Sequence, residues 1–175
     1  MHRGELRRKD REMTAEESWS LLAGAYCGRL GTSDAEGWPY VVPKMFVVVD
    51  GKIYFHSSQS RGHTRSSVEA NPRVCFEVDE PGPVFPSGED SLCNTSNGFE
   101  SVITFGTCRL VEDEEHKAKV LYALMAKYAD PAWERPDSFP MLAVTAVFEI
   151  TVERITGKRR PVAVTPRWQH LFPAP

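Results

Sequence analysis

The chain has 175 residues, of which 41% are hydrophobic and 26% are charged, and its formal net charge is −3 at pH 7. This length and composition predict a single globular domain with its own hydrophobic core. The slightly acidic balance argues against nucleic acid or a membrane surface as a partner, since both favour a basic excess. No hydrophobic run approaches the roughly 20 residues that a membrane-spanning helix needs.

The first twelve residues alternate basic and acidic side chains and lack the hydrophobic stretch of a secretory signal. We therefore expect a cytoplasmic protein with an N-terminal arm at 1–12, one domain at 13–160 and a C-terminal tail at 161–175. Its cysteines lack the close spacing of zinc ligands, so free thiols are expected, as in a reducing compartment. The four cysteines are Cys27, Cys75, Cys93 and Cys108.

The first half of the chain predicts one helix and three strands. Thr14 and Glu17 match the capping-box pattern, which predicts a helix over 15–25. Asp50-Gly51 is typical of a type I′ hairpin turn, because both central positions of that turn need positive φ. Pro43 cannot donate a hydrogen bond to a neighbouring strand, so it indicates an edge strand or a bulge. The three strands are expected at 27–32, 40–49 and 52–57.

The chain after residue 58 predicts two helices and three further strands. A long loop is expected at 81–98, which is rich in proline and glycine. The strand at 142–152 alternates hydrophobic and polar residues and is therefore expected to be half-buried. The helices are expected at 63–70 and 113–128, and the other strands at 73–79 and 99–111. About six strands without a strand–helix–strand rhythm predict a mainly β fold, an antiparallel barrel with helices outside.

The polar segment that follows the strand at 52–57 is the clearest candidate binding site. The strand ends in His56 and Ser57, and Gly62 directly precedes a short helix. Unpaired backbone N–H groups and the helix dipole suit a phosphate at such a helix start. Arg61 and Arg65 could add charge-assisted hydrogen bonds. The alternative interpretation is a solvated basic loop without a ligand.

Several segments, in this order, resemble the FMN-binding split barrels related to pyridoxamine 5′-phosphate oxidase, specifically the nitroimidazole-resistance branch. They are Tyr-Val-Val-Pro at 40–43, Tyr-Phe-His-Ser at 54–57, Gly-His at 62–63, Asn-Pro-Arg-Val at 71–74, Ser-Val-Ile at 101–103, Phe-Gly at 105–106 and Ile-Thr-Gly-Lys at 155–158. The resemblance covers about residues 10–160. It implies a six-stranded antiparallel split β-barrel with flanking α-helices.

This resemblance also implies a homodimer with two FMN sites at the interface between the subunits. Three strand residues would lie against the flavin, four residues of the loop and helix start would surround its phosphate, and the partner subunit would contribute from a further strand. The residues against the flavin would be Val42, Pro43 and Lys44. Those around the phosphate would be Ser57, Gly62, His63 and Thr64, and the partner subunit would contribute Ser101 and Val102.

One position departs from the family pattern, because Thr64 stands where relatives usually carry a lysine. Either Arg61 or Arg65 replaces the missing charge, or FMN binds more weakly. In this branch of the family a histidine at the position of His56 lies close to cofactor and substrate, which makes it the candidate catalytic residue. The alternative for His56 is a hydrogen bond to a backbone carbonyl. Lys44 either points to solvent or meets an anionic or electron-rich ligand.

The resemblance implies a flavin-dependent oxidoreductase or reductase that acts on a small molecule, with nitroaromatic compounds as one candidate class. The flavin would supply the chemistry, and Lys44 is a candidate for stabilising its anionic reduced form. No Ser-His-Asp or paired-carboxylate arrangement is evident, which argues against a hydrolase. Two alternatives stay open: a flavin carrier or sensor without turnover, and a haem-binding split barrel with His56 or His63 as axial ligand.

Overall fold

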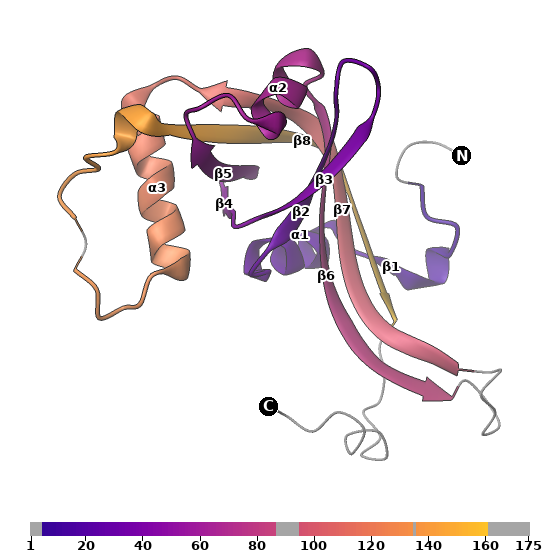
Figure 1. Ribbon diagram of the computed structural model, residues 1–175. Helices are drawn as coiled ribbons and strands as arrows, with labels where there is room; N and C mark the ends of the chain where they lie inside the picture. Colours follow the sequence, from indigo (N-terminus) through magenta and orange to yellow (C-terminus); the bar gives the residue numbers. More distant parts are fainter. Residues whose placement is uncertain (1–4, 87–94, 135, 161–175) are drawn as a thin grey trace.

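The computed structural model describes residues 5–86, 95–134 and 136–160 (Figure 1). Its centre is one antiparallel sheet in the order β3-β2-β6-β7-β8-β5-β4, with the short β1 paired to β8. The strands are β1 (Glu12–Met13), β2 (Gly28–Ser33), β3 (Pro39–Lys44), β4 (Val47–Val49), β5 (Lys52–Ser58), β6 (Arg73–Pro86), β7 (Thr95–Val111) and β8 (Thr145–Arg160). The helices are α1 (Ala15–Gly24), α2 (His63–Ala70) and α3 (Glu114–Tyr128), with 3₁₀ turns at Lys9–Arg11 and Leu142–Val144. The curled sheet and flanking helices confirm the expected split-barrel architecture.

The chain turns where its local chemistry allows. Asp50 and Gly51 join β4 to β5 with positive φ values of 51° and 72°, which confirms the predicted hairpin. The single strand expected at 40–49 is wrong, because the chain leaves β3 after Lys44 and starts β4 at Val47. Pro43 lies in β3, which ends the sheet on one side, so its edge position is confirmed.

Each long helix begins at a side-chain cap. The amide of Glu17 donates to Thr14 Oγ1 at 3.1 Å and the amide of Thr14 donates to Glu17 Oε2 at 2.8 Å, which confirms the capping box of α1. At α3 the side chain of Asp113 accepts a hydrogen bond from the amide of His116 at 2.7 Å. None of the helices in the described part of the chain is long and apolar enough to cross a membrane.

The hydrophobic core has two parts, one on each face of β5 and β8. Inside the curl, Phe55 stacks on Phe148 and Phe46 meets Phe76 edge-on, each pair with ring centroids 4.9 Å apart. The second part lies against α3 and consists of Tyr54, Val111, Val120, Leu121, Leu124 and Val147. Because α3 covers the outer face, β8 is buried on both sides from Ala146 to Ile150. The prediction that the strand at 142–152 is half-buried is therefore wrong from Ala146 to Ile150.

Glu149 lies on the face of β8 that was expected to meet solvent, yet its side chain is only 1% exposed. The Tyr54 hydroxyl donates to its carboxylate at 2.8 Å, Arg109 Nε at 2.9 Å and Lys52 Nζ at 3.1 Å. Burial alone would raise the pKa of Glu149, but these hydrogen bonds hold it below its usual value. The carboxylate therefore stays ionised inside the protein with its oxygen atoms paired.

β6 and β7 continue beyond the barrel as a long curved arm (Figure 1). β6 extends to Pro86 and β7 begins at Thr95, so the loop expected at 81–98 is wrong at both of its ends. Residues 87–94, its middle, lie outside the described residues. Two glycines permit close pairing in this arm, since a Cβ atom on Gly82 would lie 2.9 Å from the backbone of Gly98.

Candidate functional site

A polar pocket of about 380 Å³ lies at the N-terminal end of α2. It brings together six of the residues expected to bind a cofactor, and we call it the α2 pocket. Its lining consists of Ser57, Arg61, Gly62, His63, Thr64 and Arg65, together with Tyr40, Ser58 and Ser60. No side chain caps α2 at Gly62, and no acidic residue lies in its first turn. The first amides of α2 therefore remain available to an anion.

Both arginines of the α2 pocket are held by a carboxylate that sequence analysis overlooked. Arg61 Nη2 lies 2.9 Å from Glu69 Oε2, and Arg65 Nε donates to Glu69 Oε1 at 2.8 Å. Arg65 Nη1 also donates to the carbonyl of Gln59 at 2.9 Å. The four-residue spacing of Arg65 and Glu69 on one helix was the signal in the sequence that could have revealed this pairing.

Two further predicted residues, Lys44 and His56, lie near Phe55 where β3 approaches β5, and we call these three residues the β3–β5 junction. Lys44 Nζ lies 5.3 Å from the centre of the Phe55 ring. Burial lowers the pKa of Lys44, and no carboxylate of the described residues pairs with its ammonium group. The neighbouring Cys108 supplies no negative charge, because burial raises the pKa of its thiol to about 12.

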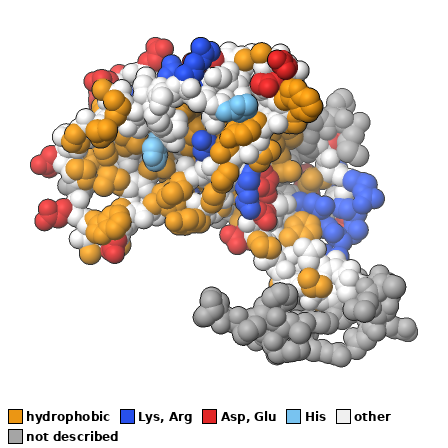
Figure 2. Space-filling view, viewed as in Figure 1, with side chains coloured by type: hydrophobic (Ala, Val, Ile, Leu, Met, Phe, Trp, Pro, Cys, Tyr) orange, Lys and Arg blue, Asp and Glu red, His pale blue; other side chains and the backbone are white. Residues whose placement is uncertain are grey.

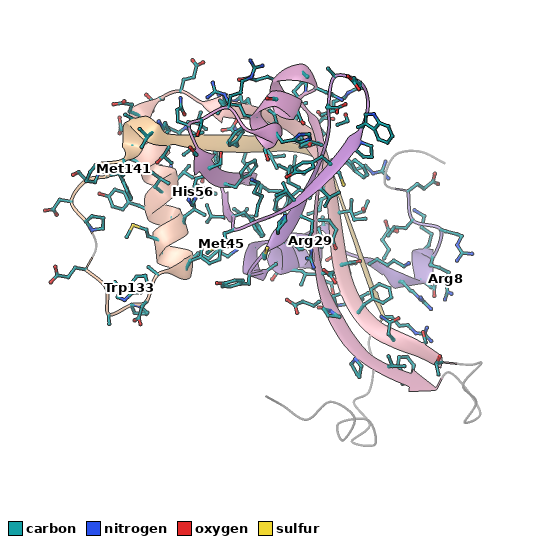
Figure 3. The ribbon with its side chains drawn as sticks, viewed as in Figure 1. Arg8, Arg29, Met45, His56, Trp133 and Met141 are labelled. Carbon is teal, nitrogen blue, oxygen red and sulfur yellow. The ribbon has the colours of Figure 1, made fainter. Side chains whose placement is uncertain are left out.

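His56 is exposed at the mouth of the β3–β5 junction. Figure 3 shows His56 and Met45 in the same region of the molecule. Figure 2, in the same view, shows many hydrophobic side chains on this face of the molecule. The surrounding protein lowers the pKa of His56, and the positive charge of Lys44 lowers it further. The imidazole is therefore neutral at pH 7, able both to donate and to accept a hydrogen bond.

The two regions are separated along β3 but adjacent on β5. β3 begins beside the α2 pocket, where the Tyr40 ring lies 4.2 Å from the His63 ring, and ends at Lys44. Four residues of strand span about 13 Å. On β5, His56 is followed directly by Ser57 of the α2 pocket. A ligand with a phosphate at one end and a ring system at the other would match this layout.

The remaining predicted residues occupy different surroundings. Val42 is half-buried against the core, and Pro43 is exposed on the edge strand. Ser101 and Val102 lie towards the arm, paired with β6 and with the last residues of β8, and Val102 is fully buried. The structure therefore does not bring these last two residues to the site of their own chain. Their contribution to a partner's site stays a prediction.

The cysteines do not form a metal site in the part of the chain that the structure describes. Cys27, Cys75 and Cys108 are free thiols, and Cys93 lies outside the described residues. No group of three or more histidine, cysteine or acidic side chains in the described ranges could hold a metal ion. The C-terminal tail expected at 161–175 also lies outside the described residues.

Solved structures of known proteins share this fold. A candidate 5-nitroimidazole antibiotic resistance protein from Bacteroides thetaiotaomicron is 26% identical, with a TM-score of 0.71 over 85% of this chain and 86% of the other. An FAD-binding protein from Mesorhizobium loti is 27% identical, with a TM-score of 0.62 over 86% and 98% of the two chains. The flavocytochrome Anf3 from Azotobacter vinelandii is 23% identical, with a TM-score of 0.77 over 97% and 79%, and this likeness concerns the fold.

No curated protein sequence matches the chain. The family described as pyridoxamine 5′-phosphate oxidase matches residues 14–159, which is most of the domain and includes both the α2 pocket and the β3–β5 junction. The family match and the shared fold agree, and the chain belongs to the pyridoxamine 5′-phosphate oxidase family.

Proposed function

We propose that this protein binds FMN along β3 and β5 and acts as a flavin-dependent oxidoreductase on small molecules, with nitroaromatic compounds as the substrate class to test first. The observation that carries the proposal is the half-buried ammonium group of Lys44, which has no carboxylate partner among the described residues, at one end of the site, with the uncapped start of α2 at the other. A buried charge without a partner is costly, so it favours an anionic or electron-rich ligand.

The residues fit a flavin at both ends. The free amides at the start of α2 and the serine hydroxyls of the α2 pocket suit the phosphate. Arg61 and Arg65 retain N–H donors that Glu69 and Gln59 do not use, since a guanidinium group has five. A single helix start suited to a phosphate among the described residues favours FMN, and the FAD-binding relative makes FAD the comparison to include in each titration.

A bound flavin would supply hydride and electron transfer, and the protein would supply orientation, charge and exclusion of water. Lys44 would place a positive charge beside the ring system, which favours the anionic reduced form. His56, neutral at pH 7, would hydrogen-bond to the flavin or to the substrate at the open mouth of the β3–β5 junction. The likeness to a candidate 5-nitroimidazole resistance protein supports a nitro compound as the electron acceptor.

We also propose that two copies associate as a homodimer, with each flavin completed by the partner subunit. The outer face of β3 and β7 supports this, because Val41 is 65% exposed and Ile103 is 38% exposed in the single chain. Light scattering of the purified protein tests the proposal, which a strictly monomeric mass at micromolar concentration would contradict.

The absorption spectrum of protein purified without added cofactor tests the central proposal. Flavin bands that NADH or NADPH bleaches, and that a 5-nitroimidazole restores under anaerobic conditions, would support a reductase. Flavin bands that no nicotinamide reductant bleaches would favour the carrier or sensor instead. A Soret band would favour the haem-binding alternative, and a protein that neither contains nor takes up a flavin would overturn the proposal.

The role of His56 can be isolated from the fold. His56→Ala should lower flavin retention or the rate of flavin reduction while leaving the midpoint of thermal unfolding unchanged, because the side chain is exposed. The matched control is His116→Ala on α3, which lies beside Tyr54 and outside the site. Equal retention and equal rates in both variants would remove His56 from the site.

A further inference from the structure

Glu69 is the acidic side chain that contacts the arginines of the α2 pocket, and nothing in the resemblance assigns it a role. Its two carboxylate oxygens are divided between the two guanidinium groups, at 2.9 Å from Arg61 Nη2 and 2.8 Å from Arg65 Nε. Both arginines line the pocket in which we place the phosphate. Any anion bound there would therefore share these arginines with Glu69.

The charge of Glu69 is permanent over the range in which the protein would function. The hydrogen bond from Arg65 holds the pKa of this carboxyl group below its usual value, and the charge of Arg61 acts in the same direction. Gly62 and Thr64, on either side of His63 at the helix start, are uncharged. Two positive charges and one negative charge thus act on a ligand beside these three side chains.

We infer that Glu69 weakens the binding of the flavin phosphate and so makes the flavin exchangeable rather than permanently held. The inference rests on the proposed function and concerns the phosphate end of the same site. A phosphate monoester carries close to two negative charges at pH 7. The carboxylate repels this dianion at short range and occupies guanidinium donors that the phosphate would otherwise use.

The pairing is also separable from the position of the arginines. Arg65 keeps a second hydrogen bond, from Nη1 to the carbonyl of Gln59, when the charge of Glu69 is removed. Glu69→Gln retains an oxygen acceptor at the same length of side chain, so a guanidinium group can still hydrogen-bond to it. This substitution therefore removes the charge with little change in geometry.

Riboflavin and FMN provide the test, because they differ only in the phosphate. Dissociation constants of both are measured by fluorescence titration for the unaltered protein and for Glu69→Gln, Glu80→Gln and Arg65→Gln. Glu69→Gln should lower the dissociation constant of FMN about three- to tenfold, the size expected for one like charge near a protein surface. The dissociation constant of riboflavin should not change. Slower release of FMN should account for most of the gain.

The control variants separate a local effect from a general one. Glu80→Gln changes the net charge by the same amount at an exposed position on the arm, and it should leave the dissociation constants of FMN and riboflavin unchanged. Arg65→Gln should weaken the binding of FMN and leave the binding of riboflavin unchanged. This result would support a phosphate in the α2 pocket. If Arg65→Gln weakens FMN binding but Glu69→Gln weakens FMN binding or leaves it unchanged, the inference is wrong and the proposed function survives. If neither the unaltered protein nor any variant binds FMN or riboflavin, the proposed function itself is wrong.

Discussion

Glu149 and Glu69 each accept contacts from two basic side chains, but they do so in opposite surroundings. Glu149 is 1% exposed and contacts Lys52, Arg109 and the Tyr54 hydroxyl, whereas the side chain of Glu69 is 34% exposed and contacts two arginines at the surface. The same chemistry therefore has different consequences. A buried carboxylate that loses its partners destabilises the fold, while an exposed one mainly changes the local charge that a ligand meets.

The largest expected effect comes from Glu149→Ala. It leaves the Tyr54 hydroxyl without its acceptor, removes the negative charge between Lys52 and Arg109, and opens a small cavity under α3. We expect the free energy of unfolding to fall by about 3 kcal/mol. Urea unfolding followed by circular dichroism measures this loss, and a decrease no larger than that of Glu69→Ala would remove the distinction between the two glutamates.

A smaller effect is expected from Tyr54→Phe, which removes one of the three hydrogen bonds to Glu149 and keeps the ring in the second core cluster. The expected loss is about 1 kcal/mol, because the carboxylate retains Lys52 and Arg109. Tyr122→Phe is the matched control, since its hydroxyl donates to the carbonyl of Pro136 at the edge of α3. A loss equal to that of Glu149→Ala would mean that the tyrosine alone stabilises the carboxylate.

The pH dependence of stability should separate the charge of Glu149 from its packing. The pKa of Glu149 is lower in the folded protein than its usual value, so its charged form stabilises the fold above that usual value. This stabilisation is lost as the pH falls through the folded pKa. The difference in unfolding free energy between the unaltered protein and Glu149→Gln should therefore shrink below about pH 4. A difference that stays constant from pH 7 to pH 3 would contradict a charge effect.

The smallest expected effect on stability comes from Glu69→Ala. Exposed ion pairs contribute little, so the midpoint of thermal unfolding should not change measurably. The same variant should bind FMN more tightly, as is expected for Glu69→Gln. A clear loss of thermal stability would show that the pairing holds α2 in place, and the contrast with Glu149 would then be one of degree.

Much of the fold could be predicted from the sequence because its signals are local. The capping box at Thr14 and Glu17, the turn at Asp50-Gly51 and the helix after Gly62 each depend on neighbouring residues. The α2 pocket is accessible to sequence reasoning for the same reason, since most of its lining is contiguous. The resemblance implied Lys44 as a flavin contact, but the contact of Lys44 with Phe55 was not predicted, because β3 and β5 are not neighbours in the sheet order.

The wrong predictions share a physical cause, which is tertiary context. Proline and glycine at 81–98 indicate a loop locally, but Gly82 and Gly98 lie opposite each other and permit a close strand pair. Glu149 occupies a polar position in a strand that alternates hydrophobic and polar residues, and only the packing of α3 shows that this face is buried. The break after Lys44 has no strong local signal, because Met45 and Phe46 suit a strand as well as a turn.

The strand order also has a consequence for synthesis. β5 pairs on one side with β4 and on the other with β8, the last strand that the structure describes. Until β8 leaves the ribosome, the β4–β5 hairpin cannot join the sheet, and the side chains of Ile53 and Phe55 lack most of their final neighbours. The barrel is therefore completed only after β8 has been made, and a nascent chain that ends before β8 would expose this hairpin to chaperones or to aggregation.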